Sequence, residues 1–364
     1  FLVRSGVITS VHSFASDPAR GLFILIFLLI VVGGSLVLYA IRAPKLVSDV
    51  RYSWFSKETS LMVNNIFLVI SAAMVLLGTL YPLIVDALSG NKISVGPPYF
   101  NSMFVPLMIP LAVLVGIGSM SRWKRDELSR FAPASIVILI SSLVLSALFT
   151  HLLTIEKFAW GGFAGLALGI WVMLWAVYSI IDRLKNYTNW FAGLRKTPAS
   201  IWGMTVAHFG IAIFVIGVTN VNTYSIEKDI RMAPGEVYQL GNYEFSFSGV
   251  TRITEQNYRA NEGRFKVSRD GNSLFELKPQ KRFYSSSNPM TEAAINTNLM
   301  RDLYVSLGED LGKGAWSVRL YLKSFVACIW LGGFFMALGG LIAITDRRYR
   351  KPIKPIATHQ LAAT

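Results

Sequence analysis

Long apolar runs separated by short basic loops dominate the chain. Seven of them are long enough to cross the roughly 30 Å hydrocarbon core of a bilayer as helices. They cover Gly21–Ile41, Thr59–Leu80, Ser102–Met120, Pro133–Leu153, Ala159–Ile181, Ser200–Val221 and Phe325–Thr345. Asp17 followed by Pro18 is typical of a helix start, with an N-cap and then proline at the first helical position. The pattern predicts a polytopic α-helical membrane protein.

The segment between the sixth and seventh runs follows a different pattern. Apolar and polar residues alternate with a period of two, as at Tyr243, Phe245 and Phe247, which is typical of half-buried strands. Turn signals occur at Pro234-Gly235, Glu262-Gly263 and Asp270-Gly271. The last of these lies between two strand-like runs and favours a β-hairpin. We therefore expect a small β-rich domain, a barrel or a sandwich, tethered by two helices.

These two patterns predict the domain organisation. Residues 1–221 form a bundle of six transmembrane helices preceded by an N-terminal segment, and residues 222–323 form the β-rich domain. Residues 324–346 form the last transmembrane helix, and residues 347–364 form a basic tail.

Composition and charge agree with a membrane protein and exclude a nucleic-acid binder. The 364 residues are 53% hydrophobic and 15% charged, and the net charge is +14. The basic residues lie in short loops, with 17 on one side of the predicted membrane and 4 in the short segments on the other. By the positive-inside rule the first side is cytoplasmic. The N-terminal segment and the β-rich domain are then external.

One candidate ligand lies inside a predicted span. The run Ser200–Val221 has no formal charge and contains a single ionisable side chain, His208. Helical spacing puts His208 on one face with Met204, Thr205, Ile211, Ala212 and Val215. An ionisable group in a bilayer is costly unless it is paired or ligated, and histidine is the commonest metal ligand. The residues leave two interpretations open: a metal or heme ligand, or a neutral histidine bonded to a neighbouring helix.

The remaining histidines, the single cysteine and the absence of common enzyme motifs limit the functions that the sequence allows. His12 lies in VHSFASDPARG just outside the first span, His151 lies near the external end of the fourth, and His359 lies in the tail. A single cysteine, Cys328, excludes an internal disulfide and a multi-cysteine metal site. The sequence contains no G-x-S-x-G, Walker-type or H-E-x-x-H motif. Because the chain begins at Phe1 without an initiator methionine or a signal-peptide pattern, we expect it to be a C-terminal piece of a longer protein.

Several segments together resemble one known family over nearly the whole chain. They are FLVRSGVITSVHSFASDPARGLFIL, SKETSLMVNNIFL, YPLIVDAL with the following GPPYFN, VAHFGIAIFVIGV and RDLYVSLGED. These segments resemble the C-terminal half of the CcmF-type cytochrome c heme lyases (CcmF, CycK and NrfE) of bacterial System I cytochrome c maturation. The resemblance implies a multi-pass protein of the bacterial inner membrane with a periplasmic β-rich domain.

The resemblance also implies site residues and cofactors. The position of His12 is that of an axial ligand to the heme that is to be attached, and His12 is therefore the expected catalytic-site residue. The position of His208 is that of an axial ligand to a resident transmembrane heme b. The family's WWxD segment and the two partner histidines are absent here and are expected N-terminal to Phe1. Implied partners are apocytochrome c, a heme chaperone, thiol-handling subunits, membrane lipid and a quinol; no nucleic acid is expected.

The implied reaction is thioether formation between heme vinyl groups and the thiols of a C-x-x-C-H segment. Three alternatives stay open from the residues: a non-enzymatic membrane carrier of heme or lipid, a structural assembly subunit, and the related lyase dedicated to a nitrite reductase.

Overall fold

The computed structural model describes residues 18–46, 51–89, 93–153, 158–284, 289–346 and 348. The chain forms two compact units, one up to Phe131 and one from Ala132 onward. Seven helices within the described residues are long and apolar enough to cross a membrane. Each coincides with one of the seven predicted runs, so the predicted multi-pass architecture is confirmed.

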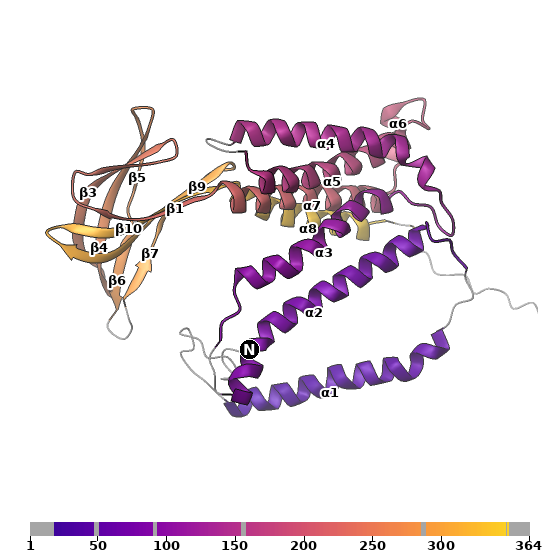
Figure 1. Cartoon of the computed structure of the whole chain (residues 1–364), viewed down its shortest axis with the longest axis horizontal. Coiled ribbons are helices and arrows are strands. Elements are labelled where there is room, and N and C mark those ends of the chain that lie inside the picture. The colour runs from indigo at the N-terminus through magenta and orange to yellow at the C-terminus, as the bar shows by residue number, and fades with distance from the viewer. Residues whose placement is uncertain are drawn as a thin grey trace, which may run out of the picture. The chain divides into compact units, whose positions relative to one another are not determined.

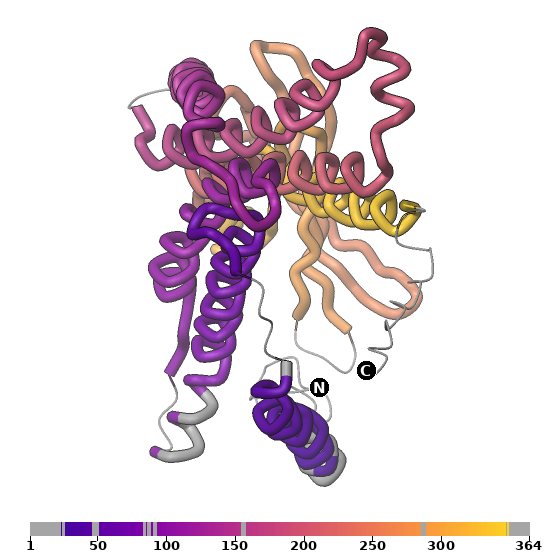
Figure 2. Tube along the Cα trace, turned by 90° about the vertical axis from the view of Figure 1, so that its right-hand side faces the viewer, coloured from indigo at the N-terminus to yellow at the C-terminus, as the bar shows by residue number. Residues whose placement is uncertain are grey.

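The first unit contains three of these helices. They are α1 (Pro18–Arg42), α2 (Lys57–Ser89) and α3 (Pro97–Gly118), with short 3-10 turns at Ala43–Leu46 and Leu128–Arg130. Figure 2 shows α2 and α3 running alongside each other. The Tyr99 ring packs against the bare backbone of Gly78, and its hydroxyl donates to the Met74 carbonyl at 3.1 Å. An aromatic side chain and a glycine thus hold this helix pair together.

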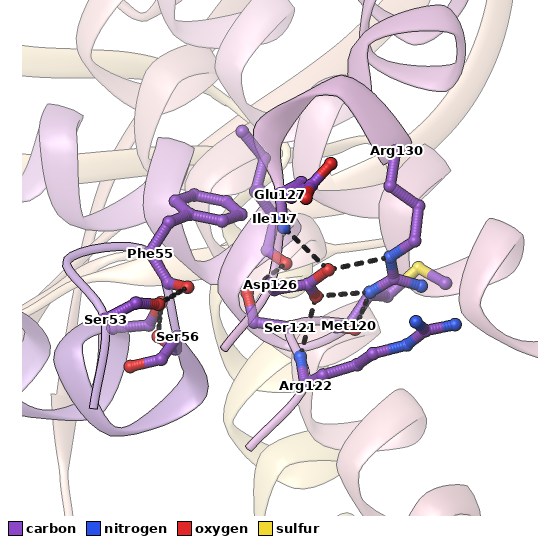
Figure 3. Close-up of polar contacts among 11 residues, drawn as sticks. Ser53, Phe55, Ser56, Ile117, Met120, Ser121, Arg122, Asp126, Glu127 and Arg130 are labelled. Carbon is purple, nitrogen blue, oxygen red and sulfur yellow. Dashed lines mark hydrogen bonds and ion pairs between the residues drawn. The ribbon is translucent and has the colours of Figure 1, made fainter. Parts of the chain in front are cut away.

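The loop that follows α3 closes on a buried carboxylate, drawn in Figure 3. Asp126 accepts hydrogen bonds from Arg130 Nη2 at 2.6 Å and Nε at 3.0 Å, and from the Arg122 amide at 2.8 Å. Its side chain is only 3% exposed. Burial by itself raises the pKa of Asp126, but these hydrogen bonds and the positive charge of Arg130 outweigh burial and leave the pKa below its ordinary value. The loop is therefore organised around a charged Asp126.

Replacing Asp126 by asparagine should loosen this loop. We expect a loss of about 1–3 kcal/mol in the free energy of unfolding, because the Arg130 guanidinium loses its charged acceptor. Glu127→Gln, a change at the exposed neighbouring position, should cost less than about 0.5 kcal/mol. Because the folded pKa of Asp126 is lowered, its stabilisation is present above the ordinary carboxyl pKa near 4 and is lost as the pH falls below it. Thermal unfolding of the wild type and the two variants at pH 7 and at about pH 2.5 measures both effects, and equal melting temperatures at pH 7 would contradict the role of Asp126.

The second unit begins with a stack of helices. It contains α4 (Ala132–Leu153), α5 (Trp160–Leu184), the short α6 (Trp190–Lys196), α7 (Ala199–Tyr224) and α8 (Val326–Ile344). Figure 1 shows α4, α5, α7 and α8 lying side by side. The sequence pattern did not predict α6, a seven-residue helix whose Asn189 side chain caps the amides of Phe191 and Ala192.

A β-sandwich is inserted between α7 and α8. One sheet has the strand order β1-β10-β9-β8, and the other has β2-β3-β4-β6-β7 with β5 also paired to β4. The strands are β1 Ile226–Met232, β2 Val237–Leu240, β3 Tyr243–Thr254, β4 Tyr258–Arg269, β5 Asn272–Leu277, β6 Gln280–Tyr284, β7 Met290–Glu292, β8 Ala294–Thr297, β9 Arg301–Gly312 and β10 Ala315–Ser324. The predicted β-rich domain is thus confirmed, and of the two forms left open it is the sandwich.

The alternating residues of both sheets meet in one core. Phe247 and Phe265 stack with ring centres 4.7 Å apart, and they face Leu303, Val305 and Leu307 of β9. Each of these side chains is fully buried. Their period-two spacing along β3, β4 and β9 is what places them on the inner faces of the sandwich.

Of the predicted turns, two are confirmed and one is wrong. Asp270 and Gly271 both have positive φ, 51° and 77°, and link β4 to β5 as a tight hairpin. Gly235 follows the β1 strand in a turn with a φ of 89°. Glu262-Gly263, in contrast, lies inside β4. A Cβ on Gly263 would come within 3.1 Å of the Phe265 ring and 3.3 Å of Leu307, so this glycine makes room for the core.

Candidate functional site

The helix that carries His208 is packed on two opposite faces. On one face, Gly203 and Gly210 of α7 meet Gly339 and Gly332 of α8. A Cβ on Gly203 would lie 2.5 Å from the Gly339 carbonyl oxygen, and one on Gly210 would lie 2.7 Å from that of Gly332. The two backbones are therefore in direct contact, as small residues permit in membrane helix pairs.

The opposite face of α7 meets α5. A Cβ on Gly169 would lie 3.3 Å from the Ala212 carbonyl oxygen and 2.6 Å from Ile216. Further along, the hydroxyls of Ser179 and Thr205 are 3.3 Å apart. Positions 205, 212 and 216 share one side of a helix, and positions 203 and 210 share the other. α7 is thereby held between α5 and α8.

His208 lies on the α5 side of this arrangement. It follows Thr205 by three residues and precedes Ala212 by four, which puts it beside the residues that meet α5. Its side chain is half-buried. Nine residues separate it from the first residue of α7, Ala199, which corresponds to a rise of about 14 Å. The imidazole therefore lies well within the span.

An aromatic column on α5 lies at the same depth as His208, and the sequence analysis missed it. The rings of Trp171 and Trp175 meet edge to face at 5.7 Å, and Tyr178 continues the column at 5.6 Å from Trp175. The three residues lie between Gly169 and Ser179 on α5. Gly169 contacts Ala212 of α7 and Ser179 contacts Thr205, and His208 lies between these two α7 residues. The spacing 171, 175, 178 is that of one helix face and could have revealed this column.

A charged contact anchors the start of α7 to the end of α8. The Asp346 carboxylate accepts from the Ser200 amide at 2.9 Å, and Arg348 Nη2 donates to the same carboxylate at 2.9 Å and to the Ser200 hydroxyl at 2.5 Å. The Arg348 side chain and amide, followed by Ser200, hold the pKa of Asp346 well below its usual range. A carboxylate at a helix N-terminus also complements the helix dipole. This contact links the first turn of α7 to the residues that follow α8.

The remaining candidate residues are not brought to this site. His12 and His359 lie outside the described residues. His151 is exposed at the C-terminal end of α4. Within the described ranges, no group of three or more His, Cys, Asp or Glu side chains could hold a metal ion. Of the candidate ligands, His208 is therefore the one that the described structure places well inside a span.

Comparisons with known proteins agree with this architecture. A family model described as the CcmF C-terminal beta-sandwich matches residues 223–324. The chain is 49% identical over 356 residues to cytochrome c-type biogenesis protein CcmF of Pseudomonas aeruginosa, covering 97% of this chain and 54% of that protein. It is 44% identical over 359 residues to CcmF of Escherichia coli strain K12, covering 98% of this chain and 54% of that protein.

A solved structure shows the same fold. The cytochrome c heme lyase CcmF aligns with a TM-score of 0.70 at 24% identity, covering 92% of this chain and 52% of that one. The chain spans about half the length of the curated relatives that it matches. With the seven apolar helices and the inserted β-sandwich of its described residues, the chain belongs to the CcmF/CycK/NrfE family of cytochrome c-type biogenesis proteins.

Proposed function

We propose that this chain forms part of a cytochrome c heme lyase in the bacterial inner membrane, with its β-sandwich in the periplasm. The observation that carries the proposal is the 49% identity to a cytochrome c biogenesis protein over 97% of this chain. The excess of lysine and arginine in the loops opposite the sandwich supports this orientation.

His208 is proposed as one axial ligand of a resident heme b. Its half-buried position on the α5 side of α7 supports this role, because a porphyrin needs an axial imidazole and apolar walls. Trp171, Trp175 and Tyr178 lie at the same depth on the neighbouring helix α5. When bound, this heme would supply one-electron transfer from a quinol toward the external face. The second axial ligand would come from outside the described residues.

His12 is proposed as the residue that holds the substrate heme at the periplasmic face. A heme chaperone of the pathway would deliver this heme, and thiol-handling subunits would keep the apocytochrome thiols reduced. Each thiol of a C-x-x-C-H segment then adds across one vinyl group, with sulfur bonding to one carbon and hydrogen to the other. The addition therefore balances without an external oxidant. Iron ligation by His12 would fix the porphyrin so that both vinyl groups meet the two thiols.

Replacing His12 by alanine should separate attachment from the resident heme. In a strain that depends on the full-length protein, we expect mature cytochrome c to fall by at least about tenfold, because substrate positioning is lost. The heme b absorption of the purified variant should stay at the wild-type level, since His208 is untouched. Covalent heme is measured by heme staining of denatured cytochrome, with His359→Ala as the matched control in the tail. Normal maturation in the His12→Ala strain would contradict the proposal and would favour a structural role.

A further inference from the structure

The first unit carries an open groove along α2 that the proposed heme chemistry does not use. Its volume is about 560 Å³, and apart from Trp123 it is lined by one face of α2, which carries the polar Glu58 and Asn65 and five apolar side chains: Leu61, Met62, Ile66, Val69 and Ile70. All five are more than a third exposed, with Val69 at 67%. At the end of the groove where α2 begins stand Glu58 and Trp123.

The groove has the length of one leaflet of a bilayer. From Glu58 to Ile70 the helix rises about 18 Å, and half of a hydrocarbon core is about 15 Å. The end at Glu58 coincides with the start of the α2 span, where the chain leaves the membrane. Trp123 is 62% exposed there, in the position typical of an interfacial tryptophan. A hydrocarbon chain that enters from this interface would end near Ile70.

The open end of the groove is basic. The Lys57 ammonium lies 5.4 Å from the centre of the Trp123 ring, and Arg122, Lys124 and Arg125 are exposed on the adjoining loop. Among the described side chains, none of these four forms an ion pair. The nearby carboxylates are already engaged: Glu58 accepts from the Lys124 amide at 2.9 and 3.0 Å, and Asp126 is bound by Arg130. Glu58 stays charged and also attracts Lys124, but the basic side chains at this end outnumber the acidic ones, so its net charge is positive.

We propose that this groove is a binding site for an anionic phospholipid. One acyl chain lies along Leu61, Ile66 and Val69, and the phosphate of the headgroup meets Lys57, Arg122 and Lys124. Charge complementarity selects an anionic headgroup over a zwitterionic one, because basic residues next to a span attract anionic lipids. The apolar row and its one-leaflet length select a lipid over a free phosphate.

The test uses the purified full-length protein, stripped of lipid in detergent and titrated with phosphatidylglycerol or phosphatidylcholine of identical acyl chains. Native mass spectrometry counts the bound lipid. We expect one phosphatidylglycerol to bind tightly, and the Lys57→Gln/Arg122→Gln/Lys124→Gln variant to bind it roughly a hundredfold more weakly. The charge-matched Arg183→Gln/Lys185→Gln/Arg195→Gln variant should bind like the wild type.

A second pair of variants tests the groove itself. Ile66→Trp fills the groove and should block phosphatidylglycerol, whereas Ile136→Trp, at a position 57% exposed on α4, should leave binding unchanged. Equal binding of the two lipids, or unchanged binding in both the Lys57 triple variant and Ile66→Trp, would overturn the proposal. A co-purifying quinone that phosphatidylglycerol fails to displace would show that a quinone occupies the groove. A dimer that Ile66→Trp dissociates would show that a second copy of the chain occupies it. Either result would overturn the proposal.

Discussion

Replacing His208 by alanine is expected to remove the proposed heme b from the purified full-length protein. The side chain is the one histidine that the described structure places well inside a span, and its loss would remove one of the axial ligands that hold the iron. Loss of even a group that supports a metal ligand typically costs 10–100-fold in metal affinity. For the ligand itself we expect a loss of more than about a hundredfold.

The control is His151, a histidine of the same unit that lies at a helix end and not deep inside a span. His151→Ala changes an exposed residue at the end of α4 and should keep the heme absorption bands at full height. His208→Met should retain part of the heme, because a thioether also ligates heme iron. The measurement is the absorption spectrum per mole of protein, with melting temperatures to show that each variant is folded. Equal heme content in all of these proteins would exclude His208 as a ligand.

Adding one methyl group at Gly332 should separate α7 from α8. A Cβ there would lie 2.7 Å from the Gly210 carbonyl oxygen and 2.7 Å from the Phe214 amide nitrogen. Both are backbone atoms, so no side chain can rotate out of the way, and the helices must move apart. We expect Gly332→Ala to cost at least about 1–3 kcal/mol, the range for overpacking, and to lower heme content by disturbing α7.

The neighbouring glycine is a matched control one residue away. A Cβ on Gly333 would meet nothing within 4 Å, so Gly333→Ala adds the same atom to the same helix without a clash. It should be neutral or stabilise the helix by up to about 1 kcal/mol, since alanine is the better helix former. Melting temperatures of the two variants give the comparison. If both melt alike, close contact between α7 and α8 does not stabilise the folded protein.

The sequence by itself determined the positions of the membrane spans and of the β-rich domain. A bilayer requires about 20 apolar residues per crossing, and this requirement is local, so the runs could be recognised one at a time. The hairpin at Asp270-Gly271 was predictable for a similar reason, because its two positive φ angles depend on the turn residues themselves. The motif around His208 was likewise visible in the sequence, although its ligand role remains a prediction.

The tertiary structure alone decided which faces of the helices meet. A membrane span that is apolar on all sides has no polar face to show which side packs against the protein. The placement of α7 between α5 and α8 therefore could not be derived from the sequence of Ser200–Val221. The same reason explains why Glu262-Gly263 resembled a turn: only the packing of Leu307 against β4 shows that this glycine clears space within a strand. The depth shared by His208 and the Trp171–Tyr178 column depends on contacts between distant segments. Such contacts come from the folded chain, because close packing depends on which two surfaces face each other, and neither segment by itself identifies its partner.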